Sequence, residues 1–576
     1  MRRFRIPALF CALAVLVCEL ISRPYANMGI CDDGPYILIA KNLAATGHIH
    51  YNGWSAAMLC WQLYLGAALI KVFGFSFTTV RMSTLLVALA TAFLLQRTLV
   101  RCGISERNSV IGTLALVLSP LYLLLSATFM SDIHGLFAIV ACFYGCLRAL
   151  QASKDRAAIG WLCFAVAVNV ACGTSRQLAW LGVLVMVPCT LWLLRGRRRV
   201  LLAGVAATVA GILCILGCML WLKHQPYILP EKLLSGRPRM MYVLYRFIEF
   251  FLEVPFLLLP IMALFLLSIR RSSPRVIAIV LGLLGIFSLF AYHPSFLRIF
   301  FSLREPTLGD WLKETGGYGA VFNGKQPILL VRGVRVLMSA VSIGGLIGLI
   351  ALLVDSNRTS PVKERSSGPS WRELGVLLAP FTIIYIILLV SRAIAISFLF
   401  DSVVLDRYAL GLLVVILICL VRYYQERVEP RLPFASVLLI GVMAIYGVAI
   451  THNMFAFYSA RVAIATELRE AGVPDTAVDN GWEYNMQVEL EYAAYINDLE
   501  IENPKGAYVP TPPPPAGPCK TFWYDKTPHI KAVYGISFDA SECYGLAPFA
   551  PVHYSRWLAR APGTLYVVRY TAPSKP

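Results

Sequence analysis

Runs of about 20 apolar residues recur along the whole chain and limit what it can fold into. A helix needs roughly 20 apolar residues to cross the hydrocarbon core of a bilayer. Charged residues make up 14% of the 576 residues, and the mean hydropathy is +0.68. Soluble proteins carry about 25% charged residues. The sequence therefore predicts a mainly α-helical integral membrane protein, with spans at 7–22, 108–127, 177–194, 200–222, 274–292, 335–354, 373–391, 403–421 and 432–450 among others.

The first apolar run has two interpretations. Arg2, Arg3 and Arg5 precede it, as they would in a cleaved signal peptide. Because about a dozen candidate helices follow, a retained first span is the favoured interpretation.

Short basic connections predict the orientation, since Lys and Arg collect on the cytoplasmic side. All the basic links fall inside only if 56–74 lies along the interface instead of crossing, and Trp61, Gln62, Tyr64 and Lys71 suit such a helix. We therefore predict about thirteen spans in the inner (cytoplasmic) membrane, a cytoplasmic N-terminus and an external, periplasmic C-terminus. The links are Arg97–Arg107, Lys154–Arg156, Arg195–Arg199, Arg270–Arg275, Arg358–Arg365 and Arg422–Arg431.

Charge is distributed unevenly along the chain. Residues 452–576 hold 10 basic and 13 acidic side chains, whereas the whole chain carries +19. The excess positive charge therefore belongs to 1–451 and indicates contact with membrane lipids, not nucleic acid. The predicted external loop 223–246 is basic against the rule, so either the rule is broken there or these cations bind an anionic partner.

The tail after residue 451 differs in character from the rest. A helical stretch at 459–472, a strand-like stretch at 564–570 and the proline-rich link 510–518 indicate a small external α/β domain. We predict a boundary between a transmembrane domain, 1–451, and this C-terminal domain, 452–576. An oxidising compartment would permit Cys519 to pair with Cys543, although the sequence does not show that they meet.

Charged residues that this topology places on the outer face have the chemistry of sugar transfer from a lipid phosphate. Such a transfer needs a base for the acceptor hydroxyl and cations for the departing phosphate. Carboxylates and arginines that fit are Asp32, Asp33, Asp132, Arg176, Arg392 and Arg407. Each one alone is equally well explained as a solvated charge at a helix end, and Asp132 as a helix cap with Ser131.

The order of these motifs resembles the polyprenyl-phosphate-dependent GT-C glycosyltransferases, which include protein O-mannosyltransferases, aminoarabinose transferases and RgtA/B/C/D-like enzymes. The likeness starts with the segment Asp32-Asp33-Gly34-Pro35-Tyr36, which resembles the first-loop signature of that superfamily. Further matches in order are Trp61, Phe73-Gly74 and Arg81, then Met130-Ser131-Asp132, Gly173-Thr174-Ser175-Arg176-Gln177 and Asp406-Arg407-Tyr408. The family's Lys-Pro-Pro-Leu type motif is absent near 56–60.

The resemblance implies a role for each matched residue. It implies that Asp32 is the base, that Asp33 shares this task or binds a metal, and that Asp132 is a second acid that orients the acceptor or the donor sugar. Arg176 and Arg407 would bind the donor phosphate. We add Arg392 as a third phosphate ligand, and possible substrate contacts at Tyr36, Lys41, His134 and Tyr408.

The resemblance implies an inverting glycosyltransferase with a polyprenyl-phosphate sugar as donor. The acceptor, a lipid, a glycan or a protein, stays open, as does the sugar. No cofactor is required by the motifs, although paired carboxylates permit a divalent metal ion. Two alternatives remain: a flippase or other transporter, whose carboxylates should lie near the membrane midplane, and a non-catalytic scaffold.

Overall fold

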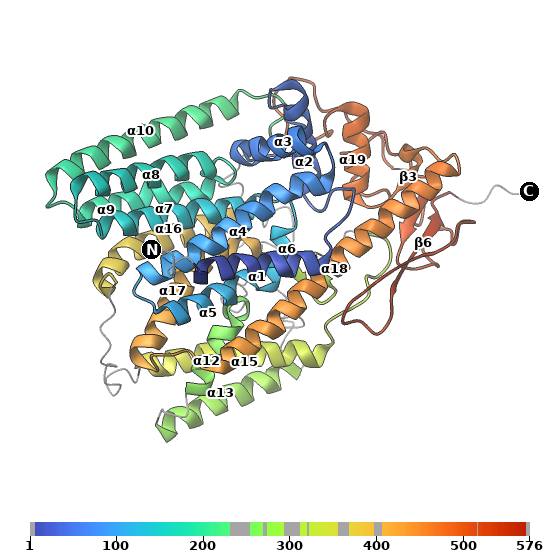
Figure 1. Ribbon diagram of the computed structural model, residues 1–576. Coiled ribbons are helices and arrows are strands. Elements are labelled where there is room, and N and C mark those ends of the chain that lie inside the picture. The colour runs from blue at the N-terminus through green and yellow to red at the C-terminus, as the bar shows by residue number, and fades with distance from the viewer. Residues whose placement is uncertain are drawn as a thin grey trace, which may run out of the picture.

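The computed structural model describes residues 6–230, 254–268, 273–292, 311–318, 322–354, 368–396, 406–514 and 517–571. These form a bundle of long helices with a small domain at one end (Figure 1). Within the described ranges, eight helices are long and apolar enough to cross a membrane, or nine if the bent pair α5 and α6 counts as one span. The chain is a polytopic membrane protein, as predicted.

Most of the predicted spans coincide with one helix, but 108–127 forms the bent pair α5 and α6, and 177–194 is an irregular run that ends in α9. The first half of the chain contributes α1 (Ile6–Ser22), α4 (Phe77–Arg101), α5 (Glu106–Val117), α6 (Pro120–Ser126), α7 (Ser131–Leu150), α8 (Asp155–Gly173), α9 (Val187–Leu193) and α10 (Arg198–Lys223). The second half contributes α12 (Leu259–Ser268), α13 (Pro274–Tyr292), α15 (Arg332–Val354), α16 (Trp371–Ile396), α17 (Leu410–Arg427) and α18 (Phe434–Glu470). A 3₁₀ turn, Gln177–Trp180, and a π-helical turn, Gly182–Met186, lead into α9, so this run is irregular at its N-terminal end.

Two short helices fill the connection between α1 and α4. They are α2 (Asp33–Thr46) and α3 (Cys60–Phe73), each 14 residues long. Gly47 ends α2 in the left-handed conformation, with φ of 78°. Since α3 is too short to span a bilayer and packs on α2 and α4, it agrees with the prediction that 56–74 does not cross.

The tail forms a mixed sheet beside one helix. Strands β3 (Val478–Asp479), β4 (Tyr534–Ser537), β6 (Gly563–Arg569) and β5 (Val552–Tyr554) lie in the order β3-β4-β6-β5. Only β3 and β4 pair in parallel. The helix is α19 (Trp482–Ala493), and Cys519 is disulfide-bonded to Cys543. The strand predicted at 564–570 is therefore present as β6, in a small α/β domain.

The helix α18 joins the tail to the bundle without a break. It is 37 residues long, so the predicted domain boundary at 452 falls within it. Figure 1 shows α18 running from one end of the bundle to the other, where α19 of the tail lies beside α2. A two-stranded ribbon, β1 (Leu312–Lys313) and β2 (Gly316–Gly317), also packs on α18.

The tail is anchored on α18 by a group we call the junction network: Tyr458, Arg461, Asn480 and Glu483. Arg461 and Glu483 are both fully buried, and their ion pair measures 3.1 Å. Arg461 also donates to the Asn480 carbonyl and, at 3.2 Å, to its side-chain oxygen. The Tyr458 hydroxyl donates to the other Glu483 oxygen.

Candidate functional site

Four charged side chains from distant parts of the sequence meet at the end of the bundle that carries the tail. Arg407 Nη2 lies 3.3 Å from Asp32 Oδ2, and Arg407 Nη1 lies 3.8 Å from Asp132 Oδ2. Arg176 Nη1 contacts Asp132 Oδ1 at 2.6 Å. We call Asp32, Arg407, Asp132 and Arg176 the site network. The structure thus brings together four residues that the sequence predicted as a site.

Each member sits where a helix begins or ends. Asp32 is the residue before α2, and Asp132 is in the first turn of α7. Arg176 follows α8, and Arg407 lies in a 3₁₀ turn, Asp406–Ala409, that leads into α17. Helix ends position side chains firmly while leaving them outside the apolar middle of the bundle, so the charges collect in one layer.

Neither carboxylate acts as a helix cap. Asp32 makes no capping bond to α2, since its oxygens face Trp54 and Arg407. Asp132 is fully buried and faces Arg176. The alternative that Asp132 is a helix cap is therefore wrong. Both carboxylates point at cations.

Asp406 places Arg407 in the site. Its carboxylate accepts backbone N–H groups from Trp311 at 3.0 Å, Leu312 at 2.8 Å and Arg407 at 2.8 Å. The segment containing β1 and the turn before α17 are thereby joined through one buried side chain. Sequence reasoning had quoted Asp406 only as part of a motif.

Asp33 has surroundings unlike those of its neighbour. Its fully buried carboxylate is bonded to Arg81 Nε at 2.8 Å and accepts the backbone N–H of Ile30 and Phe129. Arg81 in turn donates to two carbonyls of the loop after α1. Asp33 therefore holds the first loop against α4 and against the segment before α7. Its oxygens already accept four hydrogen bonds, which argues against the shared base role that the resemblance implies.

The tyrosines predicted as substrate contacts belong to the site. Tyr408 lies beneath both arginines, 4.5 Å from the Arg176 guanidinium carbon and 5.5 Å from that of Arg407. Burial, and then the Asp32 carboxylate, raise the pKa of Tyr36 well above its ordinary value. Tyr36 therefore keeps its hydroxyl proton beside Asp32.

Other predicted contacts lie elsewhere. His134 is fully buried, with Nε2 3.2 Å from Thr84 Oγ1, so in this structure it packs between helices. Lys41 is exposed, 4.7 Å above the Phe75 ring, in the last two turns of α2. The side chain of Arg392 lies outside the described part of the chain, as do 231–253, which carry most of the predicted basic loop.

Trp54 is the site residue that sequence reasoning missed. Its indole Nε1–H donates to Asp32 Oδ1 at 2.9 Å. Trp54 also stacks on Trp482 and Trp523 of the tail. A tryptophan close to the matched first-loop motif was the available signal, but its contacts depend on how the tail folds back.

The described residues do not provide a ready set of ligands for a divalent metal ion. Within the described residues, no group of three or more His, Cys, Asp or Glu side chains could hold a metal ion. The carboxylates of Asp32, Asp33 and Asp132 each face an arginine instead.

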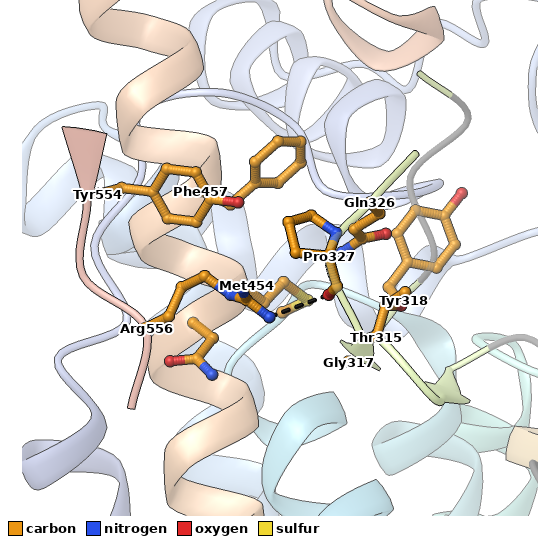
Figure 2. Close-up of a pocket in the computed structure, with 10 residues that line it drawn as sticks. Thr315, Gly317, Tyr318, Gln326, Pro327, Met454, Phe457, Tyr554 and Arg556 are labelled. Carbon is orange, nitrogen blue, oxygen red and sulfur yellow. Dashed lines mark hydrogen bonds between the residues drawn. The ribbon is translucent and has the colours of Figure 1, made fainter. Parts of the chain in front are cut away.

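Figure 2 shows a separate small pocket between α18, the tail and the segment after β2. Its lining includes Gln326, Phe457, Tyr554 and Arg556. Arg556 donates to the Pro327 carbonyl at 2.9 Å across it. None of the site network lines this pocket, so it is part of how the tail docks.

Comparison with known proteins finds similarity only among solved structures. No family model and no curated protein matches the sequence. The chain is similar to ArnT from Cupriavidus metallidurans bound to undecaprenyl phosphate, with a TM-score of 0.42 and 14% identity over 98% of this chain and 99% of that one. It is also similar to the oligosaccharyltransferase AglB from Archaeoglobus fulgidus, in complex with an inhibitory peptide and a dolichol-phosphate: TM-score 0.38, 13% identity, 91% of this chain and 64% of that one. Because both TM-scores are below 0.5, the function proposed next depends on the residues of the site itself.

Proposed function

We propose that this protein is an inverting glycosyltransferase that moves a sugar from a polyprenyl-phosphate donor to a hydroxyl acceptor on the outer face of the cytoplasmic membrane. The observation that carries the proposal is the site network, in which Arg407 contacts both Asp32 and Asp132 while Arg176 contacts Asp132. The resemblance of the motifs in sequence supports the same reaction. The external position of the site follows from the predicted topology.

Asp32 is the base in this proposal. Its side chain is 22% exposed, whereas that of Asp132 is fully buried. An acceptor hydroxyl can therefore approach Asp32 but not Asp132. In the reaction, the acceptor oxygen forms a bond to the anomeric carbon, its proton passes to Asp32, and the bond from that carbon to the phosphate oxygen breaks.

The two arginines bind the donor phosphate. Breaking the glycosidic bond leaves added negative charge on the phosphate, and guanidinium groups stabilise such charge by paired, charge-assisted hydrogen bonds. Arg176 is 17% exposed and stacks on Tyr408, which orients its plane. Asp132 holds the two arginines next to each other, since it contacts both. The products are the glycosylated acceptor and the free polyprenyl phosphate.

A donor panel tests the proposal. Purified protein in proteoliposomes is given polyprenyl phosphates carrying different labelled sugars, together with membrane lipid, glycan and protein acceptors. We expect one donor to lose its label to an acceptor and to leave polyprenyl phosphate behind. Asp32→Asn should block this release, with Asp475→Asn, a partly exposed acid paired with Arg469 in the tail, as the matched control.

Two results would contradict the proposal. One is full transfer by Asp32→Asn, which would remove Asp32 as the base. The other is movement of the intact lipid-linked sugar between leaflets with no bond broken, which would indicate a flippase instead.

A further inference from the structure

The side chain of Trp54 lies between the proposed base and the tail. Its indole N–H donates to Asp32 Oδ1 at 2.9 Å, while Arg407 contacts Oδ2 at 3.3 Å. Each oxygen of Asp32 therefore has one donor beside it. The terminal torsion of an aspartate has broad wells, so these two contacts decide which way its lone pairs point.

The tail holds Trp54 through two other tryptophans. The ring centroids of Trp482 and Trp523 lie 5.2 Å and 5.1 Å from that of Trp54, and 4.9 Å from each other. Lys526, paired with Asp498 at 2.6 Å, lies over the Trp54 and Trp523 rings. Aromatic stacking of this kind fixes ring orientation as well as position.

The backbone around Trp54 is held as well. The Asn52 carbonyl accepts the N–H of Ile496 in the tail at 2.9 Å, and the N–H of Gly53 donates to Tyr227 in the loop after α10 at 2.8 Å. Gly53 has φ of 82°, and a Cβ there would lie 2.9 Å from the Ile496 carbonyl oxygen. Any larger residue would clash with the tail at this position. Glycine therefore allows the segment carrying Trp54 to pack closely against the tail.

From these contacts we infer that Trp54 is a positioning residue for Asp32, and that the tail takes part in sugar transfer by holding Trp54 in place. This inference rests on the proposed function, because it requires Asp32 to be the base. Without the indole N–H, the ionised carboxylate loses a donor and its orientation is set by Arg407 alone. Proton transfer then slows while the donor-binding arginines stay where they are.

Trp54→Phe isolates the N–H, since phenylalanine keeps a ring for stacking and removes the donor. We expect kcat to fall about tenfold, the size of one hydrogen bond to a charged group. The KM for the donor should not change.

Trp523→Leu tests the part played by the tail. It leaves the Trp54 indole intact but removes one of its stacking partners, so kcat should fall with no change in donor KM. If the tail acts through Trp54, the double variant Trp54→Phe/Trp523→Leu should be no slower than Trp54→Phe. Trp557→Phe is the matched control, because Trp557 stacks on His452 elsewhere in the tail. Its kcat should equal that of the wild type.

The outcomes separate this inference from the proposed function. Failure of the wild type to transfer any sugar defeats the proposed function. An active wild type and an inactive Asp32→Asn, combined with an unchanged kcat in Trp54→Phe, defeat only the positioning role. If Trp54→Phe does not fold, Trp523→Leu decides: wild-type kcat in that variant contradicts the inference, and a reduced kcat at constant KM supports it.

Discussion

The site network and the junction network contain the same kinds of charged group at the same end of the molecule. They differ in how completely their members are buried and in how they contact one another. In the junction network, Arg461 and Glu483 are fully buried and bonded within the group. In the site network, Asp32 is 22% and Arg176 17% exposed, and Arg407 contacts its two carboxylates at 3.3 Å and 3.8 Å. The contacts of Arg407 are longer than the 2.6 Å pair of Arg176 and Asp132, so Arg407 can exchange a carboxylate for a phosphate at smaller cost.

This difference separates charges that stabilise the fold from charges that can bind a ligand. A buried pair with short bonds becomes very costly to break, because the remaining charge has no water to replace its partner. A network whose members are partly exposed can exchange one anion for another at smaller cost. Asp33 and Arg81 belong with the first kind, although they adjoin the second.

The largest effect on stability should come from opening the junction network. Arg461→Met leaves Glu483 buried without its cation and should lower the free energy of unfolding by about 3 to 5 kcal/mol. Unfolding of the detergent-solubilised protein, followed by tryptophan fluorescence, measures the change. The double variant Arg461→Met/Glu483→Leu should recover much of the loss. A single variant within about 1 kcal/mol of wild type would remove the distinction between the networks.

The site network should respond in activity more than in stability. Arg407→Ala should lower kcat/KM for the donor about 100-fold, because one group that stabilises the leaving phosphate is lost. Asp132 keeps its 2.6 Å contact with Arg176, so unfolding should change less than in Arg461→Met. Donor dependence equal to that of wild type would exclude Arg407 from the site.

A subtler change tests the geometry of the second arginine. Arg176→Lys keeps the charge but loses the planar group that stacks on Tyr408. We expect donor affinity to fall about tenfold, in line with a desolvated cation–π contact. Kinetics over a donor titration measure it, and a Tyr408→Leu background should abolish the difference between Arg and Lys.

The smallest expected effect is a pH dependence at the tail. Burial raises the pKa of Asp479 above its ordinary value of 3.8, although four hydrogen bonds to its oxygens oppose the shift. Because the native state then binds more protons than the unfolded state, this group lowers stability as pH rises above about 3.8. Asp479→Asn removes the dependence, so the Tm of the variant minus that of wild type should increase from pH 4 toward neutrality. A difference that stays constant or falls would contradict this sign.

The sequence predicted the helices and the small α/β domain of the tail, but not the contacts that the tail makes with the first loop. Apolar length alone locates spans such as α10 and α15, because hydrocarbon leaves a helix no alternative way to satisfy its backbone. The charged residues at helix ends were identified by the order of their motifs. Their meeting was inferred from predicted sidedness, which does not give distances.

What the sequence could not show depends on contacts between distant segments. Nothing in the local sequence distinguishes Asp33 from Asp32, and only the approach of Arg81 encloses one and leaves the other partly exposed. Trp54 reaches Asp32 across 22 residues, and its partners Trp482 and Trp523 come from the tail. Such pairings arise from tertiary folding, where no local period marks them.

Single-turnover transfer by Asp32→Asn tests the central claim most directly. The variant and wild type are loaded with labelled donor, and both donor binding and release of the sugar are followed in the same samples. We predict unchanged binding and a transfer rate lower by about 10² to 10⁴, the usual contribution of a general base. Transfer at the wild-type rate by a folded, donor-loaded Asp32→Asn would contradict the account.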